Sequence, residues 1–288
     1  MTTKQNHLMQ IIAMYIVIAV SGWLSYTYIK FDDVEVTYLV ADIVMTIVCF
    51  IFSLIKKNSS VYDAFWSVIP FYFIAHWAYM LYPVLQLEHW LIFVGVSFWS
   101  WRLTLNWARS WDGFGHEDWR YIDLAKSSGK WYPAVNFSGI HLFPTLIVFA
   151  CMWPLFYIFK PSPESSIVMY AGILLMFLGG FLELIADNQL YQFRNRKDKQ
   201  KGEILNTGLW GVVRYPNYLG EMTFWLGAAV TGLAYDAPYY AYFGIIGLVL
   251  MFVFVSIPMK EKRMAERRND YASYQKQVPM LIPFTKGK

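Results

Sequence analysis

The sequence predicts an all-α integral membrane protein, a helical bundle with about eight transmembrane helices. Hydrophobic residues make up 57% of the 288 residues and aromatic residues 19%. Charged residues make up only 15%, well below the roughly 25% that is usual in soluble domains. Apolar runs close to the roughly 20 residues that cross a bilayer recur along the whole chain. Basic residues gather in alternate connecting segments, as they do in polytopic membrane proteins.

Eight apolar runs are the expected spans, namely residues 8–29, 38–55, 65–83, 88–107, 139–159, 167–188, 216–234 and 238–258. The first run is long enough to span and has no small-residue cleavage site, so we expect a membrane helix rather than a signal peptide. No Ser- or Gly-rich linker and no internal repeat divides the chain. We therefore expect one integral unit, in which residues 1–60 form N-terminal helices and residues 61–288 continue the same domain.

The charges of the connecting segments predict the topology. The segments around 56–62, 108–138, 191–215 and 259–288 are rich in Lys and Arg. The opposite segments hold two basic residues and six acidic ones: Lys30, Lys160, Asp32, Asp33, Glu35, Glu88, Glu164 and Asp236. The positive-inside rule then places both termini in the cytoplasm, in agreement with an even number of spans. The net charge of +4 follows from this topology, and scattered basic residues give no reason to expect nucleic-acid binding.

Several familiar site types are absent from the sequence. The two cysteines, Cys49 and Cys151, both fall inside predicted spans, which excludes a disulfide framework and a Cys-rich metal site. The five histidines include no pair at metal-ligand spacing, so we expect no metal. His76 and His141 are interpreted as hydrogen-bonded interior residues. The chain has neither GxGxxG after a strand nor GxxxxGK[ST], so neither a soluble dinucleotide fold nor a P-loop is indicated.

Unusual polar residues gather at the cytoplasmic ends of the predicted spans. The run from Arg214 to Glu221 places a guanidinium, an amide and a carboxylate where an apolar helix begins, and Asn217 and Glu221 share one helical face. Spacings of three and four place further residues on single stripes: Glu183, Asp187, Tyr191 and Arg194 in the sixth span, and Arg102, Asn106 and Arg109 in the fourth. Charge at the edge of a membrane helix is costly and usually faces a cavity or a partner. We interpret these residues as a polar ligand site; the alternative is a helix cap with an interfacial ion pair.

Two further segments have two interpretations each. Residues 109–121 are dense in Trp, Arg and carboxylates, as a loop folded over a polar ligand would be. Alternatively, Trp111 and Trp119 are interfacial anchors. Asp63, at the entry of the third span, is either a buried acid or a helix N-cap.

The C-terminal half resembles the C-terminal domain of the steroid 5-alpha-reductase family, and the chain is similar to bacterial membrane proteins assigned to that family. The residues that carry the resemblance are Asp187, Arg194, Gly208-Leu209-Trp210, Arg214-Tyr215-Pro216-Asn217-Tyr218-Leu219-Gly220-Glu221 and Trp225-Leu226-Gly227. Weaker features are Tyr62-Asp63-Ala64-Phe65-Trp66, residues 102–107, 117–121 and 139–145, and the tail with Tyr271, Tyr274, Val278-Pro279 and Ile282-Pro283. The resemblance covers about residues 60–285. Isoprenylcysteine methyltransferases and sterol reductases share a related pattern.

The resemblance implies a reductase in a bacterial cell membrane, surrounded by lipid, with an NADPH pocket open to the cytoplasm. Hydride would pass to an activated C=C bond of a lipophilic small molecule of steroid, isoprenoid or lipid type. The cofactor contacts that it implies are Asp187, Arg194, Asn217 and Glu221, together with Arg102 and the nearby Asn106 in the fourth span. We include Arg109, Glu183, Tyr191 and Tyr218 in the predicted cofactor site as well. A nucleotide with a pyrophosphate and a 2′-phosphate requires several cations, and arginine binds phosphate through two hydrogen bonds.

The sequence departs from the family at the expected catalytic groups. The family's early acidic motif is not recognisable, and Trp99 stands where the family has a tyrosine. We choose Tyr62 and Asp63 as the catalytic donors, because a phenol and an acid can donate to a developing enolate.

Two alternatives remain. The first is an S-adenosylmethionine-dependent lipid methyltransferase of the isoprenylcysteine type. This alternative is weakened because the chain has Tyr215 where the related pattern commonly has a histidine. The tail also has only Glu261 and Glu266 where a paired-Glu motif is expected. The second alternative is a non-enzymatic transport or assembly protein, which polar residues in the middle of the membrane would favour.

Overall fold

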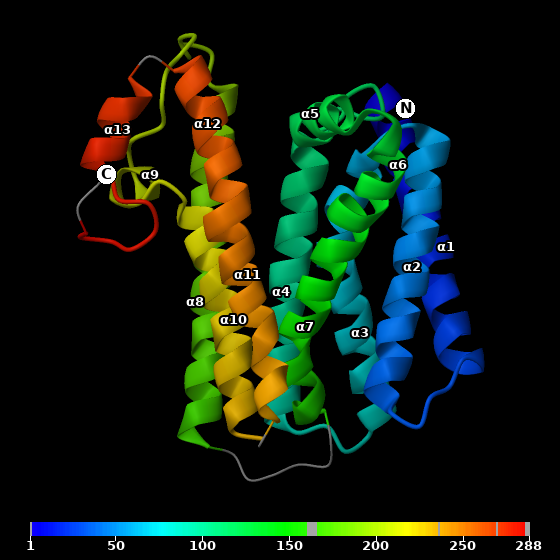
Figure 1. Ribbon diagram of the computed structural model, residues 1–288. Coiled ribbons are helices and arrows are strands. Elements are labelled where there is room, and N and C mark those ends of the chain that lie inside the picture. The colour runs from blue at the N-terminus through cyan, green and yellow to red at the C-terminus, as the bar shows by residue number, and fades with distance from the viewer. Residues whose placement is uncertain (1, 160–165, 236, 269, 286–288) are drawn as a thin grey trace. The chain divides into compact units, whose positions relative to one another are not determined.

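The computed structural model describes residues 2–159, 166–235, 237–268 and 270–285, and these ranges form helices and connecting segments without a strand (Figure 1). Lys160, Glu164, Asp236 and Lys288, which contribute to the topology prediction, lie outside the described residues. The prediction of an all-α protein is confirmed.

The longer helices are α1 (Thr3–Tyr28), α2 (Val34–Lys56), α3 (Phe65–Leu81), α4 (Leu87–Ser110), α5 (Trp119–Ser128), α7 (Phe143–Ile158), α8 (Ile167–Asn195), α10 (Pro216–Leu233), α11 (Phe243–Met251) and α12 (Ile257–Arg267). The shorter ones are η1 (Ser59–Ala64), η2 (Gly129–Trp131), α6 (Tyr132–Val135), η3 (Asn136–Leu142), α9 (Leu209–Val212), η4 (Tyr239–Tyr242), η5 (Phe252–Ser256) and α13 (Tyr271–Gln277). The segments η3 and η5 are π-helical and run directly into α7 and α12.

Among the described residues, six helical segments are long and apolar enough to cross a bilayer: residues 3–28, 34–56, 59–81, 119–158, 167–195 and 239–267. An all-helical chain with six such segments is a polytopic integral membrane protein. Helices α4 and α10 occupy the fourth and seventh predicted spans but fall short of this measure. The physical reason is that both contain polar residues of the predicted site, Arg102 and Asn106 in α4 and Asn217 and Glu221 in α10. For these two helices a full crossing stays a prediction.

The chain divides into two compact units. Unit 1 comprises residues 1–80 and 99–150, and unit 2 comprises residues 81–98 and 151–288. One division falls before the last residue of α3, and the other two fall within α4 and α7, so α4 and α7 each contribute one part to each unit. The predicted division between residues 60 and 61 lies inside unit 1.

In unit 1, α1 packs against α2 through apolar side chains and close contacts. Ile18 and Met45 are fully buried, and a Cβ atom on Gly22 would lie 2.4 Å from the sulfur of Met45. The two interior histidines are hydrogen-bonded as expected. His76 Nδ1 is 2.9 Å from the Tyr38 hydroxyl, and His141 Nε2 is 2.9 Å from the Ser53 hydroxyl.

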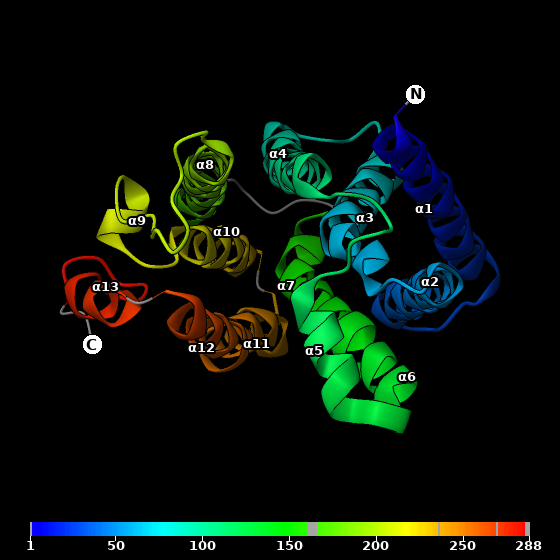
Figure 2. The same cartoon turned by 90° about the horizontal axis from the view of Figure 1, so that it is seen from above.

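In unit 2, α8 and α10 lie side by side with their backbones in close contact (Figures 1 and 2). Gly172 faces Gly227, and Gly179 faces Gly220, so each helix presents two glycines seven residues apart. A Cβ atom on Gly179 would lie 2.4 Å from the backbone nitrogen of Phe224. Small residues permit this approach in a membrane, where packing rather than the hydrophobic effect holds helices together. The order of the pairs makes the two helices antiparallel.

Candidate functional site

Three of the predicted site residues meet where α8 contacts α10, and a fourth, Glu221, lies one turn further along α10 than Asn217. Glu183 and Asp187 face this contact from α8, and Asn217 and Glu221 lie on the first turns of α10. The Glu183 side chain covers Gly220, where an added Cβ atom would lie 2.4 Å from its Cγ. The Asn217 amide donates to Asp187 Oδ1 over a long 3.5 Å. The structure thus gathers two carboxylates from one helix with an amide and a carboxylate from the other.

The sequence explains this gathering. Residues four apart lie on one helical face, so one face of α8 carries Glu183 and Asp187 and one face of α10 carries Asn217 and Glu221. The glycine pairs bring these two faces into contact. Pro216 occupies the first turn of α10, where its missing N–H is not needed.

The three carboxylates of this cluster are buried, with exposed fractions of 3% for Glu183, 7% for Asp187 and 3% for Glu221. Glu221 Oε1 accepts a hydrogen bond of 2.8 Å from the indole N–H of Trp225, one turn further along α10. Acidic groups buried in a membrane protein are costly and mark functional sites. The cluster is therefore the strongest candidate for a ligand site in unit 2.

Basic residues lie at the end of α8 that carries this cluster. Arg194 is in the last turn of α8, is exposed, and interacts electrostatically with Asp187 and Arg268. Partial burial, together with the nearby cations Arg268 and Arg194, lowers the pKa of Lys199. Like charges held together in this way favour binding of an anion, because an anion relieves their repulsion. Tyr191 is half-buried on the same stretch of α8.

Tyr218, which was also predicted to contact the cofactor, packs against other elements. Its ring stacks on Phe252 of η5 with the centroids 4.4 Å apart, and on Tyr215 at 5.7 Å. The Lys260 ammonium lies 4.1 Å from the centre of the same ring. The described contacts of Tyr218 therefore connect α10 to η5 and α12 rather than to the cluster with α8.

The other predicted cofactor residues, Arg102, Asn106 and Arg109, belong to unit 1. They lie on the second half of α4, where the Arg109 guanidinium donates to Asn106 Oδ1 from Nε at 3.0 Å and from Nη2 at 2.7 Å. The predicted stripe is therefore present, and Arg102 on it is buried. The predicted cofactor residues thus fall into two sets, one in each unit.

The proposed catalytic pair lies in η1, directly before α3, and its two side chains have different partners. The Tyr62 hydroxyl lies 2.9 Å from Thr145 Oγ1, and Thr145 Oγ1 lies 3.1 Å from Thr46 Oγ1. Asp63 instead accepts a hydrogen bond of 2.5 Å from the Tyr121 hydroxyl. Neighbouring residues on a 3₁₀-helix project in different directions, which explains the separation.

The structure also distinguishes the two interpretations of Asp63. Asn58 is the N-cap of η1, where its side-chain oxygen accepts from the backbone N–H of Ser60. Asp63 is half-buried and binds the phenol of α5. Its role in the described contacts is that of a partly buried acid.

Sequence reasoning missed a buried acid in unit 1. Asp42 lies within α2, is 3% exposed, and its Oδ1 atom has no hydrogen-bond partner among the described residues. The signal was present in the sequence, because Asp42 interrupts the apolar run 38–55. An isolated carboxyl inside a membrane helix is rare and is a functional candidate by itself.

Arg214, which we grouped with the polar residues presented to a ligand, has a structural role. The guanidinium donates to Glu261 Oε1 from Nε at 3.0 Å and from Nη2 at 2.7 Å. Its Nη1 donates to the carbonyls of Val278 at 2.6 Å and Gln275 at 3.1 Å. Arg214 is 2% exposed and connects the start of α10 to α12 and to the tail.

The same connection continues through neighbouring residues. The backbone N–H of Arg214 donates to the carbonyl of Pro279 at 2.8 Å. The Tyr215 and Tyr271 hydroxyls are 3.1 Å apart, and the Tyr274 hydroxyl donates to the carbonyl of Trp210 at 2.6 Å. The tail motif noted in the sequence therefore holds the C-terminal segment against the start of α10.

The Trp-rich segment 109–121 packs inside unit 1. Trp111 is 5% exposed, stacks on Trp107 at 5.1 Å and meets Phe114 edge-on at 5.1 Å. The backbone N–H of Phe114 donates to His7 Nδ1 at 3.3 Å. Trp111 is therefore a packing residue rather than an exposed interfacial anchor, while Trp119 begins α5.

No group of three or more His, Cys, Asp or Glu side chains is placed to hold a metal ion in the part of the chain that the structure describes.

These features define the protein as a helical integral membrane protein with a buried carboxylate and amide cluster between two closely packed helices. The chain belongs to the family described as "Protein of unknown function (DUF1295)", whose model matches residues 49–278. This family includes steroid 5-alpha-reductase-like proteins.

A curated relative is an uncharacterized protein of Schizosaccharomyces pombe, 27% identical over 260 residues, which cover 80% of this chain and 74% of the yeast protein. No solved structure matches the chain.

Proposed function

We propose that the protein is a membrane-embedded reductase that uses NADPH to reduce an activated C=C bond in a lipophilic substrate. The observation that carries the proposal is the cluster of three buried carboxylates, Glu183, Asp187 and Glu221, and the half-buried Asn217, with cationic side chains at the adjoining end of α8. The cluster offers hydrogen-bonding groups, and the cationic side chains beside it add positive charge in the same region of unit 2.

The residues present fit the chemistry of NADPH. Carboxylates accept hydrogen bonds from ribose hydroxyls, and the Asn217 amide can both donate and accept. The Asn217 amide oxygen accepts from the backbone N–H of Tyr218 at 3.1 Å. Its nitrogen contacts Asp187 only at 3.5 Å, near the limit of a hydrogen bond, so a ligand can engage the amide N–H groups at little cost. Arg194, Lys199 and Arg268 would hold the phosphates through charge-assisted hydrogen bonds.

When bound, the cofactor supplies hydride. The chain must then stabilise negative charge on the substrate oxygen and deliver a proton. We assign these tasks to Tyr62 and Asp63, whose hydroxyl and carboxyl are tied to Thr145 and Tyr121. Thr145 and Tyr121 hold the Tyr62 hydroxyl and the Asp63 carboxyl in place, as general acid catalysis requires.

Membership of a family that includes steroid 5-alpha-reductase-like proteins supports the same function. The methyltransferase alternative has less support, because Glu261 of the tail accepts two hydrogen bonds from the Arg214 guanidinium. A carboxylate used in this way has a structural role.

Calorimetry on the purified protein in lipid nanodiscs tests the cofactor. We expect NADPH to bind and S-adenosylmethionine not to bind. Arg194→Ala should weaken the binding of NADPH by about 1.5–3 kcal/mol, which is the contribution of a hydrogen bond to a charged group. Arg196→Ala is the matched control, because it removes the same charge two residues away, where the guanidinium is held by Glu203 and Asp198.

The control variant should keep NADPH affinity close to that of the wild type. Equal losses of NADPH affinity in the two variants would show that only the total positive charge of this region matters. An unchanged NADPH affinity in Arg194→Ala would exclude Arg194 from the cofactor site. Transfer of a methyl group from S-adenosylmethionine would overturn the proposed reaction class.

A further inference from the structure

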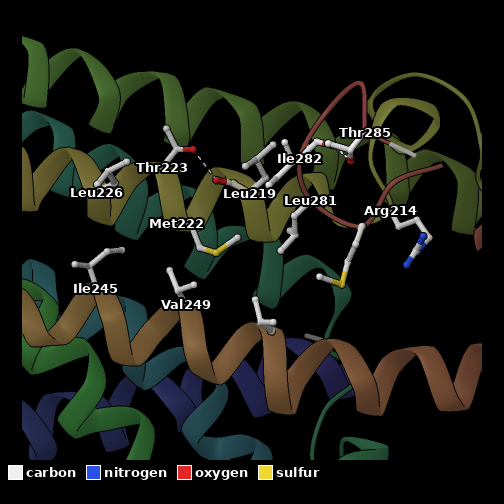
Figure 3. Close-up of a pocket in the computed structure, with 12 residues that line it drawn as sticks. Arg214, Leu219, Met222, Thr223, Leu226, Ile245, Val249, Leu281, Ile282 and Thr285 are labelled. Atoms are coloured by element: carbon white, nitrogen blue, oxygen red, sulfur yellow. Dashed lines mark hydrogen bonds between the residues drawn. The ribbon is translucent and has the colours of Figure 1, made fainter. Parts of the chain in front are cut away.

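A groove runs along α10 (Figure 3), and none of the residues that line it belongs to the carboxylate cluster. Its volume is about 560 Å³, within the roughly 300–1,000 Å³ of small-molecule sites. The lining comes from α10 and Arg214 just before it, from α11 and η5, and from residues 280–285 of the tail. Arg214 lies at one end and Ile245 and Leu226 near the other.

The groove offers almost no free polar group to an occupant. The Thr223 hydroxyl donates to the carbonyl of Leu219 at 2.7 Å, and the Thr285 hydroxyl donates to the carbonyl of Ile282 at 2.7 Å. The Arg214 guanidinium is bound to Glu261 and to two tail carbonyls. The remaining lining residues are aliphatic side chains and methionines, among them Met222, Ile245, Val249 and Leu281. Only a hydrocarbon matches such a surface.

The surroundings identify the source of this hydrocarbon. Helix α11 lies within segment 239–267, which is apolar and long enough to cross a bilayer. Ile246 and Leu250, which neighbour the groove residues Ile245 and Val249 in sequence, are 54% and 50% exposed. At this depth an exposed aliphatic face is surrounded by lipid chains. Leu226, 47% exposed, shows that the groove is open toward the same surroundings.

The segment that follows indicates which lipid is preferred. Helix α12 continues the chain beyond the groove residue Val253 and carries four basic residues, Lys260, Lys262, Arg263 and Arg267. One of its two acids, Glu261, is bound to Arg214. A basic segment directly after a membrane helix attracts anionic headgroups.

We propose that this groove is a binding site for one acyl chain of an anionic phospholipid, whose headgroup lies beside α12. The site is independent of the proposed reductase function, because it uses none of the residues assigned to cofactor or catalysis. A lipid bound here would fill the space between α10, α11 and the tail segment and would stabilise that arrangement.

Photolabelling tests the site on the unmodified protein. The protein is reconstituted with phosphatidylglycerol that carries a diazirine on its acyl chain, irradiated, and mapped by peptide mass spectrometry. A bound chain should label Ile245, Val249 and Val253 more than their exposed neighbours Ile246, Leu250 and Phe254. Lipid that merely surrounds the helix would label the exposed residues more, and that result would overturn the proposal.

A matched pair of variants gives a second test. Ile245→Trp fills the groove and should reduce its labelling at least fivefold, whereas Ile246→Trp makes the same change on the exposed face and should leave it unchanged. Equal labelling of the groove in the two variants would overturn the site. The same experiment with phosphatidylcholine should label the groove less, and equal labelling by the two lipids would overturn the preference for an anionic headgroup.

Discussion

Replacing Gly179 with alanine should separate α8 from α10 and destabilise unit 2. An added Cβ atom would lie 2.4 Å from the Phe224 nitrogen and 2.6 Å from the Gly220 oxygen. Ordinary contact begins at 3.4 Å, so the first distance is about 1 Å too short. Both opposing atoms belong to the backbone and cannot rotate away. The helices must therefore move apart along the surface that also carries Asp187 and Asn217.

The expected magnitude follows from two opposing terms. Overpacking of a well-packed interior costs about 1–3 kcal/mol. The higher helix propensity of alanine offsets about 0.5–1 kcal/mol of this. These terms leave a net loss of about 0–2.5 kcal/mol, centred near about 1 kcal/mol. The central value corresponds to a fall in the melting temperature of roughly 2–4 °C for a chain of this size.

Thermal unfolding in detergent, followed by tryptophan fluorescence, measures the change. Gly139→Ala is the matched control, because the same substitution in a helix there meets no atom within 4 Å. We expect Gly139→Ala to be neutral or slightly stabilising. If Gly179→Ala were as stable as Gly139→Ala, the close approach of α8 and α10 would be refuted.

Three further predictions follow from the contacts described above. Arg214→Lys keeps the charge but loses the planar guanidinium, so it should lower the free energy of unfolding by about 1.5–3 kcal/mol in thermal unfolding. The control is Lys262→Ala, at an exposed position of α12, which should change the stability little. The pKa of Glu203 is lowered mainly by its hydrogen bond from Arg196, so its contribution is present above the ordinary glutamate pKa and is lost as the pH falls through its lowered value. The protection factors of residues 196–203 in hydrogen exchange, taken relative to the intrinsic exchange rate at each pH, should therefore fall in acid, and this loss of protection should be absent in Arg196→Ala. Tyr62→Phe should lower the rate of NADPH oxidation with an enone-bearing lipophilic substrate by at least roughly 10²-fold. Calorimetry should show unchanged NADPH binding in this variant. Unchanged turnover would exclude Tyr62 as the donor.

Part of the candidate site was predictable because it depends on spacing along a helix. Residues four apart share a face whatever surrounds them, so the pairing of Glu183 with Asp187, and of Asn217 with Glu221, follows from the sequence. The contact between these two faces needed the structure. It depends on glycines seven residues apart in two helices that are distant in sequence.

Arg214 shows the opposite case. In sequence it belongs to the same polar run as Asn217 and Glu221, and all three appear available to a ligand. In the structure its guanidinium is bound to Glu261 and to tail carbonyls some 60 residues away in sequence. Sequence spacing carries no information about such long-range partners, so a structural arginine and a ligand-binding arginine look alike.

By itself, the sequence determined that the chain is a helical membrane protein. Its apolar runs match the thickness of a bilayer, and a run of this length satisfies its own backbone hydrogen bonds in lipid only as a helix. It also determined which polar side chains share a helical face. Only the tertiary structure decided which of these faces meet, that Tyr62 and Asp63 have separate partners, and that α10 lines an aliphatic groove with residues that do not belong to its polar cluster. The reason is that helix geometry is local, whereas the partner of each face is chosen by close packing between segments distant in sequence.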